Sequence, residues 1–180
     1  MTTATKQQLP TGTWNVDATH SQVGFAVDYM GGTFRGSFSP VEATLEVAED
    51  GSVELKGSAQ AAAIHILDEN LTTHLLSPDF FDAERTPGIG FTANEVTSDG
   101  NNVVVDGELT IKGITKPVEL KGTTTDPIAD PYGNSRIGLT LSTTIDRTQF
   151  GLDWNNPLPS GEPALSNDVT LTAELFLVKA

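Results

Sequence analysis

Apolar and polar side chains alternate along most of this 180-residue chain. Successive side chains of a β-strand point to opposite faces of its sheet, so strict alternation predicts a strand with one apolar face and one wet face. Such strands are typical of antiparallel sheets. Turn signals such as Asp50-Gly51 and Asp99-Gly100 separate the alternating stretches. The pattern predicts strands over residues 23–29, 41–47, 53–59, 89–93, 103–111, 118–120, 137–145 and 169–177.

One segment departs from this alternation and predicts a helix. Leu71 and Leu75 are four residues apart, as one face of an α-helix requires. Asp68 is suited to cap the N-terminus of such a helix, and Pro78 to end it. The sequence therefore predicts one short helix among the strands.

Aromatic side chains cluster directly after this helix and after one of the strands. Phe80-Phe81 follows the helix, and Phe150 and Trp154 follow the strand over residues 137–145. If Phe80-Phe81 is extended, its two rings point in opposite directions and only one faces the interior. We expect the helix and this pair to form a lid over an apolar pocket.

Eight or nine strands with one short helix predict a closed antiparallel β-barrel or a sandwich. Closure removes the sheet edges that strands of this length would otherwise expose. A barrel of eight strands has room for its own side chains or for one small ligand. Small residues on the expected inner faces favour a hollow barrel; they are Gly57, Ala59, Ala61, Ala93 and Gly107.

Length and charge narrow the class of protein. The length fits one domain over residues 13–180 after a flexible tail over residues 1–12. The formal net charge of −14 argues against nucleic-acid and anionic-lipid surfaces as partners. There is no cysteine, and neither a secretory leader nor a transmembrane segment is recognisable, so we expect a cytoplasmic protein.

The three histidines do not show the spacing of a metal site. We expect His20 to be buried and hydrogen-bonded, and His65, which lies between two isoleucines, to be an edge or core residue. His74, on the predicted helix, is expected to point into solvent; the alternative is that its side chain points into the mouth of a cavity.

Arg147 is the cation with the most suggestive position, because it lies beside Asp146 in a chain with few cations. An ion pair with Asp146 or Asp17 is the simplest interpretation. Contact with the head group of a ligand is the alternative. No catalytic motif, such as a nucleophile elbow, occurs in the sequence.

Five strings that occur in order resemble the YceI-like family. They are WNVDATHS at residues 14–21, SPDFFD at 77–82, GELTIKGITKPV at 107–118, DRTQFG at 146–151 and DV at 168–169. The resemblance implies an elongated lipocalin-like barrel that holds a polyisoprenoid or similar lipid, and it implies a homodimer. Many members have a histidine where this chain has Tyr29, whose hydroxyl can replace the imidazole as a hydrogen-bond donor.

The resemblance and the alternation together predict a non-catalytic lipid-binding protein without a metal or cofactor, whose ligand is a polyisoprenoid or isoprenoid-quinone-like lipid. Two alternatives stay open: an enzyme of unknown class that uses polar groups in the cavity, and an acidic stress or scaffold module without a ligand. The residues expected to line the ligand are Phe25, Val27, Tyr29, Phe34, Phe38, Leu71, Leu75, Phe80, Phe81, Phe91, Leu109, Ile111, Ile145, Phe150, Leu152 and Trp154.

The last strand supports the expected homodimer. Phe176 and Val178 lie on the face opposite to Leu175 and Leu177, so both faces of the strand are apolar near its end. A strand that is apolar on both faces requires cover on both.

Overall fold

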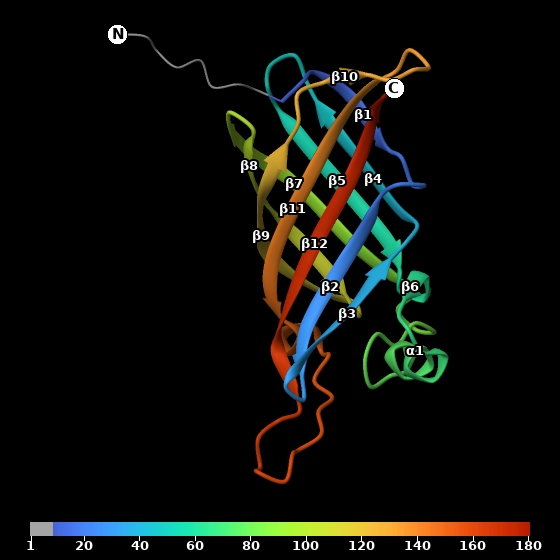
Figure 1. The fold of residues 1–180 in the computed structure, drawn as a ribbon. Helices are drawn as coiled ribbons and strands as arrows, with labels where there is room; N and C mark the ends of the chain where they lie inside the picture. The colour runs from blue at the N-terminus through green and yellow to red at the C-terminus, as the bar shows by residue number, and fades with distance from the viewer. Residues whose placement is uncertain (1–8) are drawn as a thin grey trace.

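The computed structural model describes residues 9–180, which form one antiparallel sheet that closes on itself (Figure 1). Two short 3₁₀ turns and the single helix of these residues interrupt the strands. In chain order the elements are β1 (Gly12–Val16), β2 (Gln22–Tyr29), β3 (Gly32–Phe38), β4 (Val41–Val47), β5 (Val53–Gln60), η1 (Ala61–Ala63), β6 (Ile64–His65), α1 (Glu69–Leu76), β7 (Gly88–Asp99), β8 (Asn102–Ile111), β9 (Ile114–Thr124), β10 (Ile128–Ala129), β11 (Ser135–Asp146), η2 (Arg147–Phe150) and β12 (Leu165–Lys179).

Eight of these strands close the barrel, as the sequence predicts. The ring runs β11-β9-β8-β7-β5-β4-β1-β12, and the long pairing of β12 with β11 completes it. Closure leaves these strands without a free edge over the paired lengths. The lipocalin-like closed barrel with one short helix is therefore confirmed.

Strand β12 changes its neighbour along its length. Near the C-terminus it pairs with β1, where Leu177 lies opposite Val16. From Leu165 to Glu174 it pairs with β2 instead. Strand β2 then pairs with β3, and β3 with the two-residue β6, so this group forms the wall of the barrel at the end that α1 covers (Figure 1).

Inward-facing side chains fill the end of the barrel away from α1. Two of them, Trp14 and Leu45, are almost completely buried and lie opposite one another on β1 and β4. Val103 and Leu177 are buried on β8 and β12. The alternating apolar residues thus form a packed core at this end, as their spacing requires.

The predicted tail only partly coincides with the described residues. Residues 1–8 lie outside the described part of the chain, whereas Leu9 is buried in the core. The indole Nε1–H of Trp14 donates a hydrogen bond of 2.9 Å to the carbonyl of Pro10. Leu9 therefore belongs to the packed domain, four residues before the predicted boundary at residue 13.

The predicted helix is confirmed. The carboxylate of Asp68 accepts a hydrogen bond of 2.9 Å from the backbone N–H of Leu71 and so caps α1. The expectation of an extended Phe80-Phe81 is wrong, because this pair lies in a turn. The N–H of Phe80 donates to the carbonyl of Ser77, and the N–H of Phe81 to that of Leu75.

Candidate functional site: an apolar cavity beneath the helix

The barrel is hollow at the end that α1 covers. A cavity of about 450 Å³ lies there, within the usual size range of small-molecule sites. Every residue predicted to line a ligand except Phe150 borders this cavity. Those that do are Phe25, Val27, Tyr29, Phe34, Phe38, Leu71, Leu75, Phe80, Phe81, Phe91, Leu109, Ile111, Ile145, Leu152 and Trp154.

Phe150 belongs to the packed core instead. It lies at the end of η2, where the chain leaves the strand direction of β11. The two-residue periodicity that correctly predicts Ile145 does not extend through a 3₁₀ turn. Phe150 is only 1% exposed but does not border the cavity.

The cavity also has lining residues that were not predicted to contact a ligand, although Gly57 and Ala59 among them were expected on the inner faces. Most are apolar members of the alternating faces, and continuing the same period along each strand would have found them. They include Val23, Val41, Ala43, Leu55, Gly57, Ala59, Ile89, Val118, Leu120, Leu141, Val169, Leu171, Ala173 and Leu175.

Two glycines allow large rings to pack into the wall. A Cβ on Gly36 would collide with the ring of Phe25 and with Ile66, so glycine leaves the space that the Phe25 ring fills. A Cβ on Gly107 would collide with Phe91 and Ala93. Gly107 therefore accommodates a neighbouring side chain and does not enlarge the cavity, contrary to the expectation from its size.

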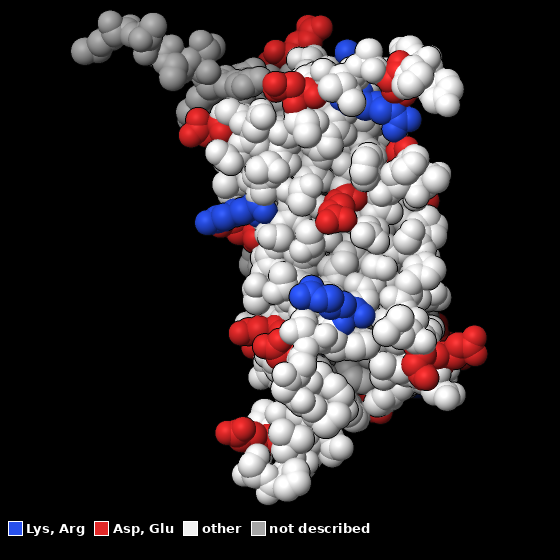
Figure 2. All heavy atoms as spheres, viewed as in Figure 1, with Lys and Arg blue, Asp and Glu red and all other residues white. Residues whose placement is uncertain are grey.

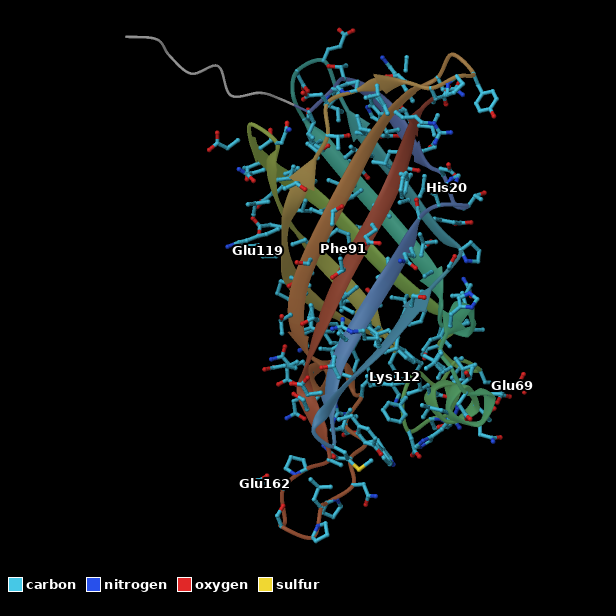
Figure 3. The ribbon with its side chains drawn as sticks, in the orientation of Figure 1. His20, Glu69, Phe91, Lys112, Glu119 and Glu162 are labelled. Carbon is cyan, nitrogen blue, oxygen red and sulfur yellow. The ribbon has the colours of Figure 1, made fainter. Side chains whose placement is uncertain are left out.

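Helix α1 and the turn after it cover the cavity. The rings of Phe81 and Phe38 meet edge to face at 5.6 Å between centroids, and those of Phe80 and Trp154 lie 5.4 Å apart. The Lys112 ammonium, on the side of the barrel that faces α1 (Figure 3), donates to the carbonyl of Pro78 at 2.7 Å. These contacts hold the lid to the barrel rim.

His74 borders the cavity mouth, so the expectation that it points into solvent is wrong. Its ring packs edge to face against Phe80 and Trp154, each at 5.1 Å between centroids. Its Nε2 lies 3.1 Å from the carboxylate of Asp79. The position of His74 on α1 therefore places its imidazole where the helix meets the barrel rim.

Arg147 is the cation at the cavity wall, and only 4% of it is exposed. Its guanidinium donates to four backbone carbonyls: Nε to Ser166 at 2.8 Å, Nη1 to Leu152 and Trp154, and Nη2 to Leu165. Burial lowers the pKa of this guanidinium, but arginine stays charged at any ordinary pH.

The predicted ion pairs of Arg147 are absent from residues 9–180. The Asp146 carboxylate accepts hydrogen bonds from Thr148, which lower the pKa of that carboxyl. Asp17 pairs with Arg136 instead, at 3.0 Å. Arg136 is far from Asp17 in sequence, so no local pattern could reveal this pair.

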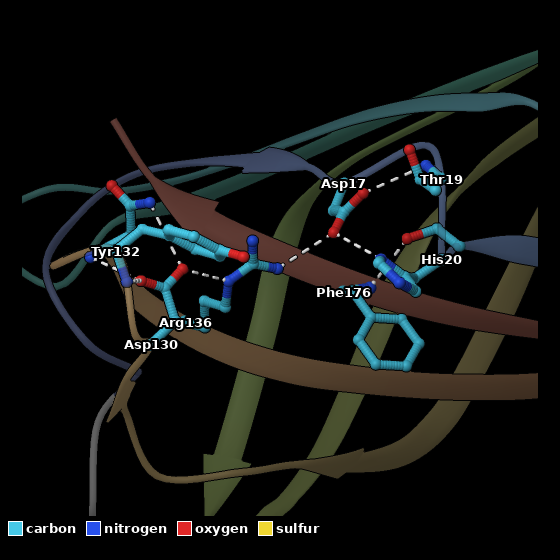
Figure 4. Close-up of polar contacts among 9 residues, drawn as sticks. Asp17, Thr19, His20, Asp130, Tyr132, Arg136 and Phe176 are labelled. Atoms are coloured by element: carbon cyan, nitrogen blue, oxygen red, sulfur yellow. Dashed lines mark hydrogen bonds and ion pairs between the residues drawn. The ribbon is translucent and has the colours of Figure 1, made fainter.

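A polar network on the outer surface surrounds Asp17 (Figure 4). Arg136 bridges Asp17 and Asp130, and the Nδ1 of His20 lies 2.8 Å from the Asp17 carboxylate. Hydrogen bonds from His20 and Arg136 lower the pKa of Asp17 to about 2, and Arg136 lowers that of Asp130 to about 2. The expected hydrogen bond of His20 is confirmed, but its burial is not: the side chain is 63% exposed.

This network lies apart from the cavity, because none of its residues borders the cavity. The remaining histidine, His65, is exposed on the short β6, with its Nε2 2.8 Å from the carbonyl of Ser39. Within residues 9–180 no group of His, Cys, Asp or Glu side chains is arranged to hold a metal ion. No helix in that part of the chain has the length and apolar composition to cross a bilayer.

Comparison with known proteins gives relatives over most of the chain. A family model described as the YceI-like domain matches residues 14–177. A UPF0312 protein of Photorhabdus laumondii subsp. laumondii is 31% identical over 140 residues, covering 76% of this chain and 72% of the relative. A UPF0312 protein of Pseudomonas putida is 32% identical over 142 residues, covering 74% and 71%.

Solved structures share the fold. BcnA of Burkholderia cenocepacia has a TM-score of 0.77 at 20% identity, covering 89% of this chain and 98% of BcnA. A polyisoprenoid binding domain from Saccharophagus degradans has a TM-score of 0.66 at 13% identity, covering 93% and 98%. At these identities the likeness establishes the architecture of the barrel.

Proposed function

The chain belongs to the YceI-like domain family, and on that premise we propose that it is a non-catalytic lipid-binding protein that holds a polyisoprenoid or similarly long apolar chain in the barrel cavity. The observation that carries this proposal is the apolar cavity of about 450 Å³ beneath α1. The fold shared with a polyisoprenoid binding domain supports it.

The cavity volume sets the length of chain that it can bury. A methylene group occupies about as much space as a water molecule, roughly 30 Å³, so 450 Å³ holds about fifteen methylenes. At about 0.8 kcal/mol each, their burial contributes about 12 kcal/mol before the cost of association, which is about 4–15 kcal/mol. Useful affinity therefore requires a chain that fills most of the cavity, and a longer polyisoprenoid extends out of the mouth.

Native mass spectrometry of the purified protein, followed by solvent extraction, tests this proposal. We expect the protein to retain a lipid with a long apolar chain, or to bind added geranylgeraniol with one molecule per cavity. A protein that carries no lipid and does not bind geranylgeraniol up to its solubility limit would contradict the proposal.

The side chains around the cavity favour binding over catalysis. The titratable residues that border it are Tyr29, Glu42, His74 and Arg147. Arg147 is committed to four backbone carbonyls, His74 lies against Asp79, and Glu42 is exposed. We infer that the protein binds its lipid without chemical change. Recovery of a covalently altered lipid after incubation would favour the enzyme alternative. The scaffold alternative needs a filled barrel, and the cavity argues against it.

We also propose that the protein is a homodimer. Phe176 faces outward near the end of β12, is 49% exposed and lies 5.7 Å from the ring of His20. The outer face formed by β11, β12 and β2 carries few charged side chains (Figure 2) although the net charge of the chain is −14. A sheet face with few charges beside an exposed aromatic ring is suited to a second copy of the chain.

A further inference from the structure

Hydrogen-bond donors gather at one place on the otherwise apolar cavity wall. Tyr29, Arg147 and Trp154 all border the cavity. Tyr29 lies opposite Leu165 where β2 pairs with β12, and the carbonyl of that same Leu165 accepts a hydrogen bond from Arg147. The carbonyl of Trp154 accepts another, at 2.9 Å. The three residues therefore belong to one stretch of wall.

These three side chains have donor capacity that the described residues leave unused. A guanidinium carries five N–H groups, and four of those of Arg147 bond to backbone carbonyls. Tyr29 and Trp154 are half-buried, and no fully buried side-chain donor of residues 9–180 lacks a partner, so the Tyr29 hydroxyl and the Trp154 indole N–H are accessible and open to a ligand. Three donors beside an apolar cavity favour a ligand group that accepts hydrogen bonds.

The charge of Arg147 favours an anion over a neutral acceptor. The guanidinium is almost fully buried, and no carboxylate of residues 9–180 forms an ion pair with it. Its four bonded partners are neutral carbonyls. Asp146 and Asp153 act on this charge only through space, without a direct ion pair. A buried charge without a directly bonded counterion is costly, and an anionic ligand group would supply one.

The carboxylates near the mouth do not prevent this arrangement. Asp146 keeps its charge but directs its carboxylate to Thr148 and not to Arg147, and Asp79 lies against His74. Asp153 is exposed, so solvent and salt screen its charge. The one carboxylate that borders the cavity, Glu42, is an exposed residue of β4.

We propose that the cavity binds an amphiphile whose anionic head group, a carboxylate or a phosphate, contacts Arg147, Tyr29 and Trp154 while its apolar chain fills the barrel. This assignment rests on the proposed lipid-binding function and specifies the class of lipid. The head group then lies near the lid, and the chain points toward the packed end of the barrel.

Chain-matched ligands test the head group. The test measures how strongly hexadecanoic acid, its methyl ester, hexadecyl phosphate and hexadecanol each displace the neutral fluorophore diphenylhexatriene from the purified protein. We expect the acid or the phosphate to bind about tenfold more tightly than its neutral counterpart, as hydrogen bonds to a charged group imply. The acid–ester pair reports on a carboxylate and the phosphate–alcohol pair on a phosphate.

Tyr29→Phe is the matched variant, because it removes one hydroxyl from the wall and leaves the ring. We expect it to weaken binding of the preferred anion about tenfold and to leave its neutral counterpart unchanged. Tyr132→Phe is the control, since Tyr132 is 86% exposed and does not border the cavity. Substituting Arg147 itself would leave four backbone carbonyls without their donor, so a loss of binding could reflect a change in the fold.

Each outcome is decisive. Equal affinity for charged and neutral ligands would overturn the anionic head group and leave the lipid-binding function standing. An anion preference that Tyr29→Phe leaves intact would overturn the placement beside Tyr29. Failure of all four ligands to displace the fluorophore would overturn the proposed function as well.

Discussion

Replacing Leu75 by tryptophan should shorten the chain that the cavity can hold. Leu75 is a buried residue of α1 that borders the cavity. Tryptophan has six more side-chain non-hydrogen atoms than leucine, so the indole displaces about six of the roughly fifteen methylenes. At about 0.8 kcal/mol each, a ligand that fills the cavity loses up to about 5 kcal/mol of burial.

The expected result depends on ligand length. A chain of about sixteen carbons should bind Leu75→Trp at least tenfold more weakly, because part of it must leave the cavity. A chain of about nine carbons fits the remaining space and should bind both proteins alike. Displacement of diphenylhexatriene by alcohols of increasing length measures this difference.

Leu67→Trp is the matched control, because Leu67 is fully exposed just before α1 and does not border the cavity. It makes the same chemical change, and the long chain should bind it as tightly as the unmodified protein. If folded Leu75→Trp, judged by circular dichroism and thermal unfolding, binds the long chain with unchanged affinity, α1 does not cover the ligand site and the reasoning fails.

Three further predictions concern stability and assembly. The folded pKa values of Asp17 and Asp130 are about 2, against an ordinary 3.8, so the stability that these carboxylates contribute is complete above about pH 4 and is lost toward pH 2. Arg136→Gln should reduce this pH dependence of the free energy of unfolding, which urea denaturation at each pH measures. Arg147→Ala should lower the free energy of unfolding by about 3–5 kcal/mol, because buried carbonyls lose their donor; urea denaturation measures it. Phe176→Asp should convert the proposed homodimer to a monomer in sedimentation velocity, whereas an unchanged mass would place the interface elsewhere.

The elements that the sequence predicts well are those that local physics determines. Alternation predicts most strands because each residue needs only its immediate neighbours to be assigned to a face. Asp68 predicts the start of α1 because an N-cap bonds within three residues. The lining positions Phe25 and Val27 follow from the same period, since both lie on the inner face of β2.

The features that the sequence does not reveal depend on contacts between distant parts of the chain. Asp17 pairs with Arg136 on another strand, and Arg147 bonds to carbonyls that β12 supplies. His74 is directed to the cavity by rings of the lid and of the segment after η2, such as Trp154. Charge pairing within a short window could suggest only the neighbour of Arg147, Asp146, which bonds elsewhere.

The cavity itself follows from the topology of the barrel. At the packed end β12 pairs with the five-residue β1, and at the other end with β2, which brings β3 and β6 into the wall. The width of a barrel grows with the number of strands around it, so side chains of similar size that fill the narrower end leave space at the wider end. Because β6 is only two residues long, this wall is incomplete, and α1 with the Phe80-Phe81 turn covers the gap. The same change of strand partner therefore creates both the space for a ligand and the opening that the helix must cover.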